Sequence, residues 1–422
     1  MDRRRRKIVQ SVAAIGAAAG VTAAVPGVTN ANPSGTITGL PLVNTITNSS
    51  VPQPERNGLG GTDPGPRDIA IDEQNPDLLA PPLTDAGTLP NLKWPFSLSH
   101  NRLASGGWAR ETTIQELPVS TEMAGVDMRL NPGAIRELHW HPVGEWGIVT
   151  VGSIQITCLD AGGRMFVDNL NQGDLWFFPE AYPHSLQAFG GVGSQFVLVF
   201  MDGDYSENDT FLLSDAFAHI PKDVLAKNFR VPVSEVSNLA SPSQRYIYPG
   251  QIPSTIVSVP EPYGNPPQAF GYHMSNNKSV LQNEAGTVHI VDSSSFPVTG
   301  ISVALVTVNP GHMREIHWHS NDEWEYFLQG QGRLTAFAAS GTAATFDYRT
   351  GDVGYVPSNY LHYVENTGNT PLQYMEVFRS PKYDSFSLAQ WMGVAPPWLV
   401  QGDLNVSQAF MSKLPTKKPI LV

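Results

Sequence analysis

The sequence GAIRELHWHPVGEWGIVTVG, residues 133–152, indicates the fold, because a similar sequence recurs later in the chain. The second copy is GHMREIHWHSNDEWEYFLQG, residues 311–330, at an offset of 311 − 133 = 178 residues. The same offset relates three later pairs: Gly173 and Gly351, Pro179 and Pro357, and His184 and His362. Repeated matches at one spacing indicate that the chain consists of two copies of one domain.

Each copy has the sequence pattern of short strands. Apolar residues such as Val149, Val151 and Ile154 alternate with small or polar ones, and glycines follow at turn spacing. This predicts an all-β fold with a sandwich or barrel in each copy and short flanking helices near residues 215–229 and 387–400. The single cysteine, Cys158, falls on this alternation, so we expect a buried strand residue.

The repeated histidines have the spacing of metal ligands. Residues i and i+2 of a strand point to the same face, so His139 and His141 both face inward and Trp140 faces the other way. Two candidate ligand sets result: His139, His141, Glu145 and His184 in the first copy, and His317, His319, Glu323 and His362 in the second. Three imidazoles and one carboxylate suit Mn(II) or Fe(II), and Zn or Ni less well.

An arginine precedes the first histidine of each copy by three residues. Arg136 and Arg314 would face away from the ligands on a regular strand, because an odd separation reverses the face. A β-bulge would turn them inward. A surface salt bridge and a substrate contact therefore remain alternatives for both arginines.

Composition and the first residues limit the partners and the location. A formal net charge of −12 argues against nucleic acid as a partner. Residues 1–31 combine a basic segment with an apolar, alanine-rich one, which predicts an export signal peptide. We expect a secreted protein, periplasmic or extracellular, with no membrane association once the signal is removed. An extended arm (32–93), a first domain (94–235), a linker (236–267) and a second domain (268–422) follow.

The first motif matches the cupin signature G-x5-H-x-H-x3-4-E-x6-G, and both copies match most of the second cupin motif. The first copy departs from that motif with Ala188 in place of Asn, and both lack its central Gly. Longer phrases, such as GDLWFFPEAYPHSLQAF (173–189) and TGDVGYVPSNYLHYVEN (350–366), resemble bicupin oxalate decarboxylases. The resemblance extends from roughly residue 65 to the C-terminus. It implies two cupin domains, each a jelly-roll barrel holding Mn(II), with dioxygen as co-catalyst, oxalate as substrate, and a homo-oligomer, a trimer or hexamer.

The resemblance also assigns roles to residues outside the ligand sets. It places Arg136 and Arg314 in substrate pockets and makes Glu207, within the lid sequence SENDT (206–210), the general acid of decarboxylation. The second copy has Ser385 at the position of Glu207, which favours catalysis in the first copy. The lid departs from the family at Asp209, where the family has Ser.

Other assignments concern the second copy and the tryptophans. The resemblance places Glu376 near the second metal, together with Tyr383, as a further candidate catalytic residue. Trp140 and its counterpart Trp318 either pack the barrels or relay electrons between the sites.

The expected activity is therefore manganese- and dioxygen-dependent decarboxylation of oxalate to formate and carbon dioxide. The nearest alternative is an oxalate oxidase, which has the same fold, metal and substrate and releases carbon dioxide and hydrogen peroxide. A non-catalytic storage-type bicupin is the second alternative, but such proteins usually lack a full ligand set, and this chain has two.

Overall fold

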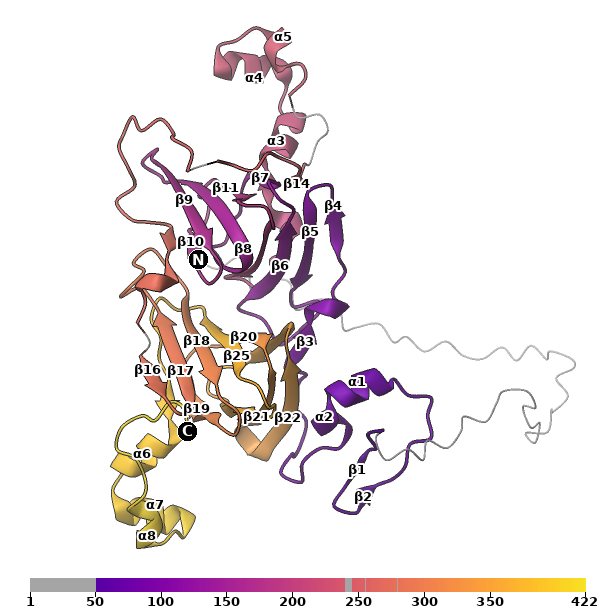
Figure 1. Cartoon of the computed structure of the whole chain (residues 1–422), viewed down its shortest axis with the longest axis vertical. Coiled ribbons are helices and arrows are strands. Elements are labelled where there is room, and N and C mark those ends of the chain that lie inside the picture. The colour runs from indigo at the N-terminus through magenta and orange to yellow at the C-terminus, as the bar shows by residue number, and fades with distance from the viewer. Residues whose placement is uncertain (1–50, 240–244, 255, 279) are drawn as a thin grey trace, which may run out of the picture. The chain divides into compact units, whose positions relative to one another are not determined.

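The computed structural model describes residues 51–239, 245–254, 256–278 and 280–422. The expected signal peptide, residues 1–31, lies outside the described residues. Two barrels of antiparallel strands make up most of the described chain (Figure 1), which confirms the predicted all-β fold of two tandem domains. Among the described residues, no helix is long and apolar enough to span a membrane.

Barrel one contains the first metal motif. Its strands are β4 (Arg102–Ala104), β5 (Gly107–Thr112), β6 (Ala124–Leu130), β7 (Ile135–Trp140), β8 (Glu145–Leu159), β9 (Met165–Asn171), β10 (Leu175–Phe178), β11 (His184–Ala188), β12 (Ser194–Phe200) and β13 (Phe211–Leu212). They pair in the order β13-β7-β11-β8-β12-β6-β5-β4, with β9 and β10 both on β8.

Barrel two repeats this arrangement as two sheets. Its strands are β16 (Leu281–Asn283), β17 (Gly286–Val291), β18 (Ser302–Val308), β19 (Met313–Trp318), β20 (Glu323–Gln329), β21 (Gln331–Ala338), β22 (Thr342–Arg349), β23 (Asp352–Val356), β24 (Leu361–Asn366), β25 (Leu372–Phe378) and β26 (Phe386–Ser387). The orders are β16-β17-β18-β25-β20-β23-β3 and β22-β21-β24-β19-β26. Strand β3 (Lys93–Pro95), at the expected boundary between the arm and the first domain, pairs with β23 and so completes barrel two.

The arm and the linker both add secondary structure. The arm forms β1 (Glu55–Arg56), β2 (Leu59–Gly60), α1 (Ile69–Gln74) and α2 (Pro76–Leu79), and η1 (Phe96–Leu98) follows β3. Buried Asp77 of α2 pairs with Arg56 and with Arg333 of barrel two. The linker adds β14 (Ile247–Tyr248), which pairs with β7, and β15 (Gly271–Tyr272), which pairs with β10. Two 3₁₀ turns of the second half are η3 (Met274–Asn276) and η4 (Ala339–Gly341).

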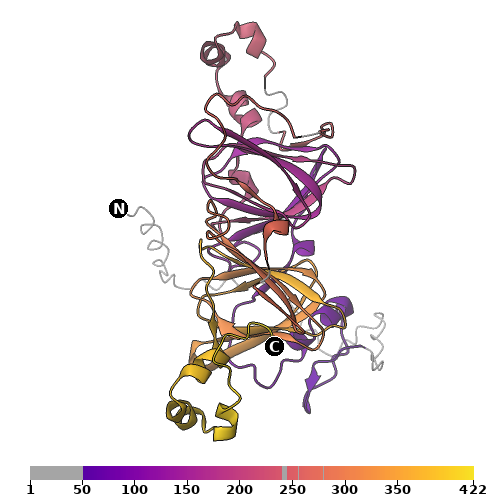
Figure 2. The ribbon, with the colours of Figure 1, turned by 60° about the vertical axis from the view of Figure 1, so that its left-hand side comes forward.

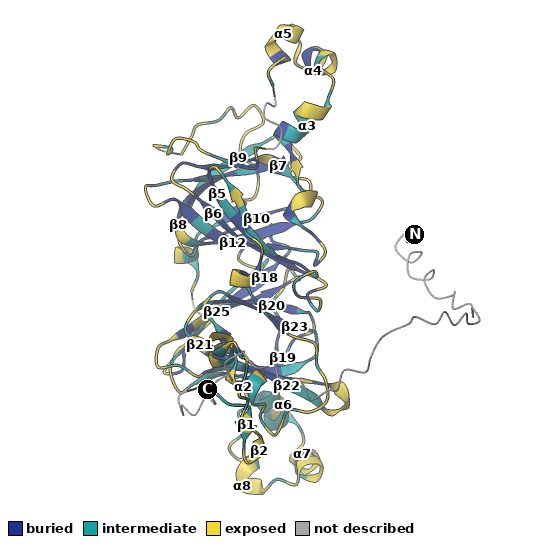
Figure 3. Cartoon of the chain, turned by 90° about the vertical axis from the view of Figure 1, so that its right-hand side faces the viewer, coloured by how far each residue is buried: buried dark blue, intermediate teal, exposed yellow. Residues whose placement is uncertain are grey.

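Short helices follow each barrel, as the sequence predicts. They are α3 (Leu213–His219), α4 (Lys222–Phe229) and α5 (Val233–Val236) after barrel one, and α6 (Leu388–Val394), α7 (Pro397–Leu404) and α8 (Gln408–Met411) after barrel two. Both groups extend beyond the barrels (Figure 2), and most of their surface is exposed (Figure 3).

Each barrel has its own apolar core, and a third cluster joins the two. Trp146 of barrel one and Trp324 of barrel two both lie in this shared cluster, fully buried. A Cβ atom at Gly125 would lie 2.4 Å from the Trp324 ring, so this close approach of the barrels requires glycine. The shared core places both repeated motifs in one compact unit.

Asp127 on β6 gives the stability of the fold a testable pH dependence. Burial raises the pKa of Asp127 to about 6, although Gln195 donates a hydrogen bond to it and Arg110 lies near. The pKa of Asp127 is higher in the folded state than in the unfolded chain. Its contribution to the free energy of unfolding is therefore fully present below about pH 4 and is lost as the pH rises through about 6. The ionised carboxylate then costs the folded state on the order of 2–3 kcal/mol.

We expect Asp127→Asn, which removes the charge and keeps an acceptor, to raise the melting temperature at pH 7.5 by about 2–5 °C. At pH 4 the difference should vanish. Calorimetry at both pH values measures this, with Asp403→Asn on exposed α7 as the control for loss of one charge. Equal melting temperatures at pH 7.5 would contradict the assignment.

Candidate active site

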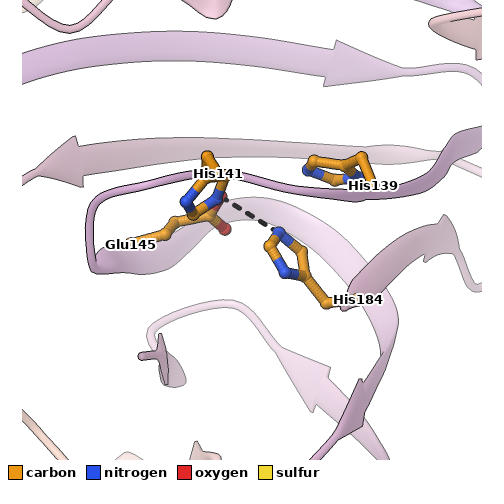
Figure 4. Close-up of side chains that lie close together, drawn as sticks. All are labelled: His139, His141, Glu145 and His184. Atoms are coloured by element: carbon orange, nitrogen blue, oxygen red, sulfur yellow. Dashed lines mark hydrogen bonds and ion pairs between the residues drawn. The ribbon is translucent and has the colours of Figure 1, made fainter. Parts of the chain in front are cut away.

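The structure brings the first predicted ligand set together inside barrel one. His139 lies on β7, His141 directly after it, Glu145 at the start of β8 and His184 at the start of β11. All four side chains are buried, and their ligand atoms lie within 4.8 Å of one another. Figure 4 shows how they face a common point. The alternation predicted for His139, Trp140 and His141 is therefore correct.

Backbone carbonyls fix the orientation of each imidazole. The Nδ1 atoms of His139, His141 and His184 lie 2.6, 2.6 and 2.7 Å from the carbonyl oxygens of Glu137, Val143 and Tyr182. A proton on Nδ1 that is donated to a carbonyl leaves Nε2 free to bind a metal. Burial, followed by the charge of Arg136, holds the pKa of His139 well below its usual value, so this ring is neutral.

The ligand carboxylate of barrel one is also held from outside the set. Trp176 donates its indole N–H to Glu145 Oε1 at 2.8 Å, while Glu145 Oε2 lies 3.1 Å from His141 Nε2. Burial alone would raise the pKa of Glu145, but the adjacent His141 and His184 rings outweigh burial and lower it. Glu145 is therefore an anion with one oxygen directed at the histidines.

The second ligand set is assembled in the same way in barrel two. Its four side chains are buried, and their ligand atoms meet the same 4.8 Å limit. Among the described residues, both carboxylate oxygens of Glu323 and the Nε2 atoms of His317, His319 and His362 have no hydrogen-bond partner. Buried polar atoms without partners are costly unless a cation binds them. These orphaned atoms fit a bound metal ion.

A β-bulge turns each arginine toward its ligand set. Arg136 and His139 are three residues apart on β7. Their partners on β11, Leu186 and His184, are only two residues apart. The extra residue of β7 is the bulge that the sequence required. The same shift occurs between Arg314 and His317 in barrel two. Both arginines are buried rather than exposed on the surface.

The two arginines differ in their partners. Arg314 donates Nε to Glu376 at 3.0 Å, Nη2 to the hydroxyl of Tyr383 at 3.0 Å and Nη1 to the carbonyl of Ile420 at 3.2 Å. Arg136 donates Nη2 to Glu207 at 2.9 Å, and its buried Nη1 has no partner among the described residues. Among the described residues, Arg136 thus offers a buried cationic donor to a ligand, whereas its counterpart Arg314 has all its donor groups engaged.

The lid residue Glu207 lies in the short 3₁₀ helix η2 (Glu207–Asp209) and is buried against Arg136. Tyr246 donates its hydroxyl to the same carboxylate oxygen at 3.1 Å, and its ring stacks on the Arg136 guanidinium at 4.3 Å. Asp209 is exposed and turns back to accept the Ser206 backbone N–H at 3.2 Å. Asp209 therefore closes a capping box rather than extending toward Glu207.

Sequence reasoning missed Tyr246, which lies in the expected linker. Its backbone has a φ of 53°, which is unusual for a bulky residue. Buried Glu137 holds this conformation, because it accepts the Tyr246 N–H at 2.5 Å while the Glu137 N–H donates to the Tyr246 carbonyl. In the sequence, only the short apolar run around Ile247 indicates that this segment forms a strand and not just a connection.

The remaining predicted residues lie near the sites in different ways. Glu376 is fully buried and accepts hydrogen bonds from Arg314, Tyr374 and Tyr383, so it serves to hold Arg314. Trp140 stacks on Phe211 with ring centroids 5.6 Å apart, and Trp318 stacks on Phe386 at the same separation. Both tryptophans are partly exposed on the outer barrel face. Packing accounts for these contacts, and electron relay stays a prediction.

Comparison with known proteins gives consistent matches across both barrels. A family model described as Cupin matches residues 99–237 and 272–410. Oxalate decarboxylase OxdC of Bacillus subtilis is 47% identical over 374 residues, covering 88% of this chain and 96% of that protein. A probable oxalate decarboxylase of Arthroderma benhamiae is 37% identical over 378 residues, covering 87% and 92%.

A solved structure agrees with the fold over most of the chain. A structure of Bacillus subtilis oxalate decarboxylase, studied for its Mn(II) centres, is 47% identical with a TM-score of 0.85. The match covers 88% of this chain and 99% of that one.

Removal of one ligand tests whether the two sites are independent. We expect His141→Ala to lower the bound metal from about two ions to about one per chain, because each ligand set lies within a single barrel. Elemental analysis of the purified protein measures this, with His219→Ala on the outer helix α3 as control. Loss of both ions, or of neither, would contradict independent sites.

Proposed function

Because the chain belongs to the bicupin oxalate decarboxylase family of cupins, we propose that it converts oxalate to formate and carbon dioxide in barrel one. The observation that carries this assignment is the unpartnered Nη1 of buried Arg136, next to Glu207 and the first ligand set. The carbon–carbon bond breaks, one carboxylate leaves as carbon dioxide, and the carbon that remains takes up a proton.

We propose Mn(II) as the metal of both ligand sets and dioxygen as co-catalyst. The donor set of three imidazoles and a carboxylate supports a borderline-hard divalent cation, and the similar Bacillus subtilis enzyme has Mn(II) centres. When bound, such an ion supplies a Lewis acid and a redox centre that weaken the carbon–carbon bond of oxalate.

In this proposal Arg136 binds and orients the substrate. Its guanidinium lies in a buried, low-dielectric site, where a charge-assisted hydrogen bond to a carboxylate is strong. The negative Glu207 beside it outweighs burial and raises the pKa of Arg136, so the guanidinium stays charged. Tyr246 stacks on the guanidinium and holds its plane in place.

Paired with Arg136 as a carboxylate in the free site, Glu207 would take up the proton that hydrogen oxalate brings and deliver it to carbon as the general acid. Its carboxyl group is buried, so bulk water does not compete to protonate the carbon. Its contacts with Arg136 and Tyr246 keep it where the substrate is bound. Barrel two has Ser385 at this position and an arginine with all three donor groups engaged, which supports catalysis in barrel one.

The same residues distinguish decarboxylation from the alternative functions. An oxalate oxidase would use the same ligands and Arg136 and would leave no role for a buried acid in the lid. A storage-type bicupin would have no reason to keep eight buried ligands in two complete sets. The buried acid therefore favours decarboxylation.

We further propose export from the cytoplasm and assembly into a trimer or hexamer. The basic and apolar residues of 1–31 support export. Exposed apolar side chains on the outer helices support assembly, and Trp391 and Trp398 are 61% and 73% exposed.

We expect Glu207→Gln to lower formate production by roughly 10²-fold or more, because the amide keeps the shape of the side chain but donates no carboxylic proton. The unprotonated intermediate would be oxidised instead, so peroxide per oxalate consumed should rise. Formate and peroxide assays under air measure both products, with Ser385→Ala as the control. Unchanged formate would show that another group is the acid, and a wild-type protein that yields mainly peroxide would be an oxidase.

A second comparison separates the two arginines. Arg136→Lys keeps the charge but not the planar fork, so kcat/KM for oxalate should fall roughly 10- to 100-fold. Arg314→Lys should leave kcat/KM within about threefold and lower the melting temperature instead, because it breaks a buried network. Steady-state kinetics and calorimetry on both variants measure this. Equal losses of kcat/KM would argue against a single catalytic barrel.

A further inference from the structure

The lid of barrel one is attached to a neighbouring strand as well as to Arg136. The carboxylate of Glu111, on β5, accepts two hydrogen bonds from the lid, one at each oxygen. The Ser206 hydroxyl donates to Oε1 at 3.1 Å, and the Glu207 backbone N–H donates to Oε2 at 2.9 Å. Glu111 therefore holds the backbone of the residue whose side chain contacts Arg136.

A second contact comes from the strand before it. Arg102 on β4 lies 3.4 Å from the side-chain oxygen of Asn208, and its guanidinium stacks on the Tyr246 ring at 3.7 Å. A cavity of about 260 Å³ lies behind the lid, lined by Arg102, Glu111, Glu207, Asn208 and Tyr246 among others. This cavity gives the lid space to move when those contacts break.

Barrel two has apolar residues at both equivalent positions. Glu111 pairs with Val126 on β6. The counterpart of Val126 in barrel two is Ala304 (126 + 178 = 304) on β18, which pairs with Ile290, so Ile290 takes the place of Glu111. By the same hairpin register, Leu281 of β16 takes the place of Arg102. Among the described residues, the two polar contacts thus occur in barrel one, which has Glu207, and are missing from barrel two, which has Ser385 at that position.

We propose that Glu111 is a positioning residue that latches the lid closed and so sets Glu207 against Arg136. Glu111 touches neither the ligand set nor the proposed substrate position, and it acts through the lid backbone. Burial raises the pKa of Glu111, and the hydrogen bond from the Glu207 backbone N–H opposes this rise. The inference rests on the proposed function only for its effect on the products.

Glu111→Gln tests the latch with little change in volume. Its amide nitrogen cannot accept from the lid, so one of the two hydrogen bonds is lost. The net value of one such bond corresponds to a roughly 2- to 10-fold more frequent opening. Backbone hydrogen exchange of the lid segment 205–211 in the metal-loaded enzyme should accelerate by that factor, and peroxide per formate should rise. Asp127→Asn is the control, because Asp127 is a buried carboxylate on adjacent β6 that accepts a hydrogen bond from Gln195 and not from the lid. It should change neither the lid exchange nor the peroxide per formate.

The two readouts separate failure of the latch from failure of the proposed function. Unchanged lid exchange in Glu111→Gln at an unchanged melting temperature would overturn the latch whatever the enzyme produces. Faster exchange with unchanged products would overturn its role in the reaction. If the wild-type enzyme releases no formate, the proposed function fails, and the exchange measurement still tests the latch. Glu111→Ala loses both hydrogen bonds, so its lid exchange should be faster, and its peroxide per formate higher, than in Glu111→Gln. A smaller effect would also overturn the proposal.

Discussion

The β-bulge between Arg136 and His139 is the constraint on which the site depends. A regular strand would direct one of these side chains into the barrel and the other to its outer face. The extra residue lets a cation and a metal ligand share one interior, although they are an odd number of residues apart. Glu137, within the same bulged segment, holds the strained backbone of Tyr246 and so places its ring against Arg136.

The same skeleton supports two different sites because the surroundings of the bulge differ. In barrel one the Trp176 ring fills the space over Gly147 and donates its N–H to the ligand Glu145. In barrel two Gly354 replaces that tryptophan, and the side chain of Glu325 fills the space instead. Burial, followed by the charge of Glu323, raises the pKa of Glu325 well above its usual value. One ligand carboxylate therefore accepts an indole N–H, and its counterpart faces a second carboxyl group.

Much of the fold and of the ligand sets was predictable, because both rest on short periodicities and on a repeat at one offset. The inward direction of His139 and His141 follows from strand alternation alone. The partners of Arg136 were not predictable in the same way. Tyr246 and Glu111 come from distant segments without a motif, and only the folded register places them beside Glu207. The pairing of β3 with β23 of barrel two has the same cause.

The role of Asp209, where the lid departs from the family sequence, follows from the direction of its side chain in the structure. From the sequence, an added carboxylate two residues from Glu207 suggests either an electrostatic effect on the acid or a reshaped lid. In the folded chain its side chain turns away and accepts the N–H of Ser206. The Ser206 hydroxyl in turn contacts both Asn208 and Glu111. The charge of Asp209 thus stabilises the turn that presents Glu207, so its influence on the chemistry passes through the geometry of the lid.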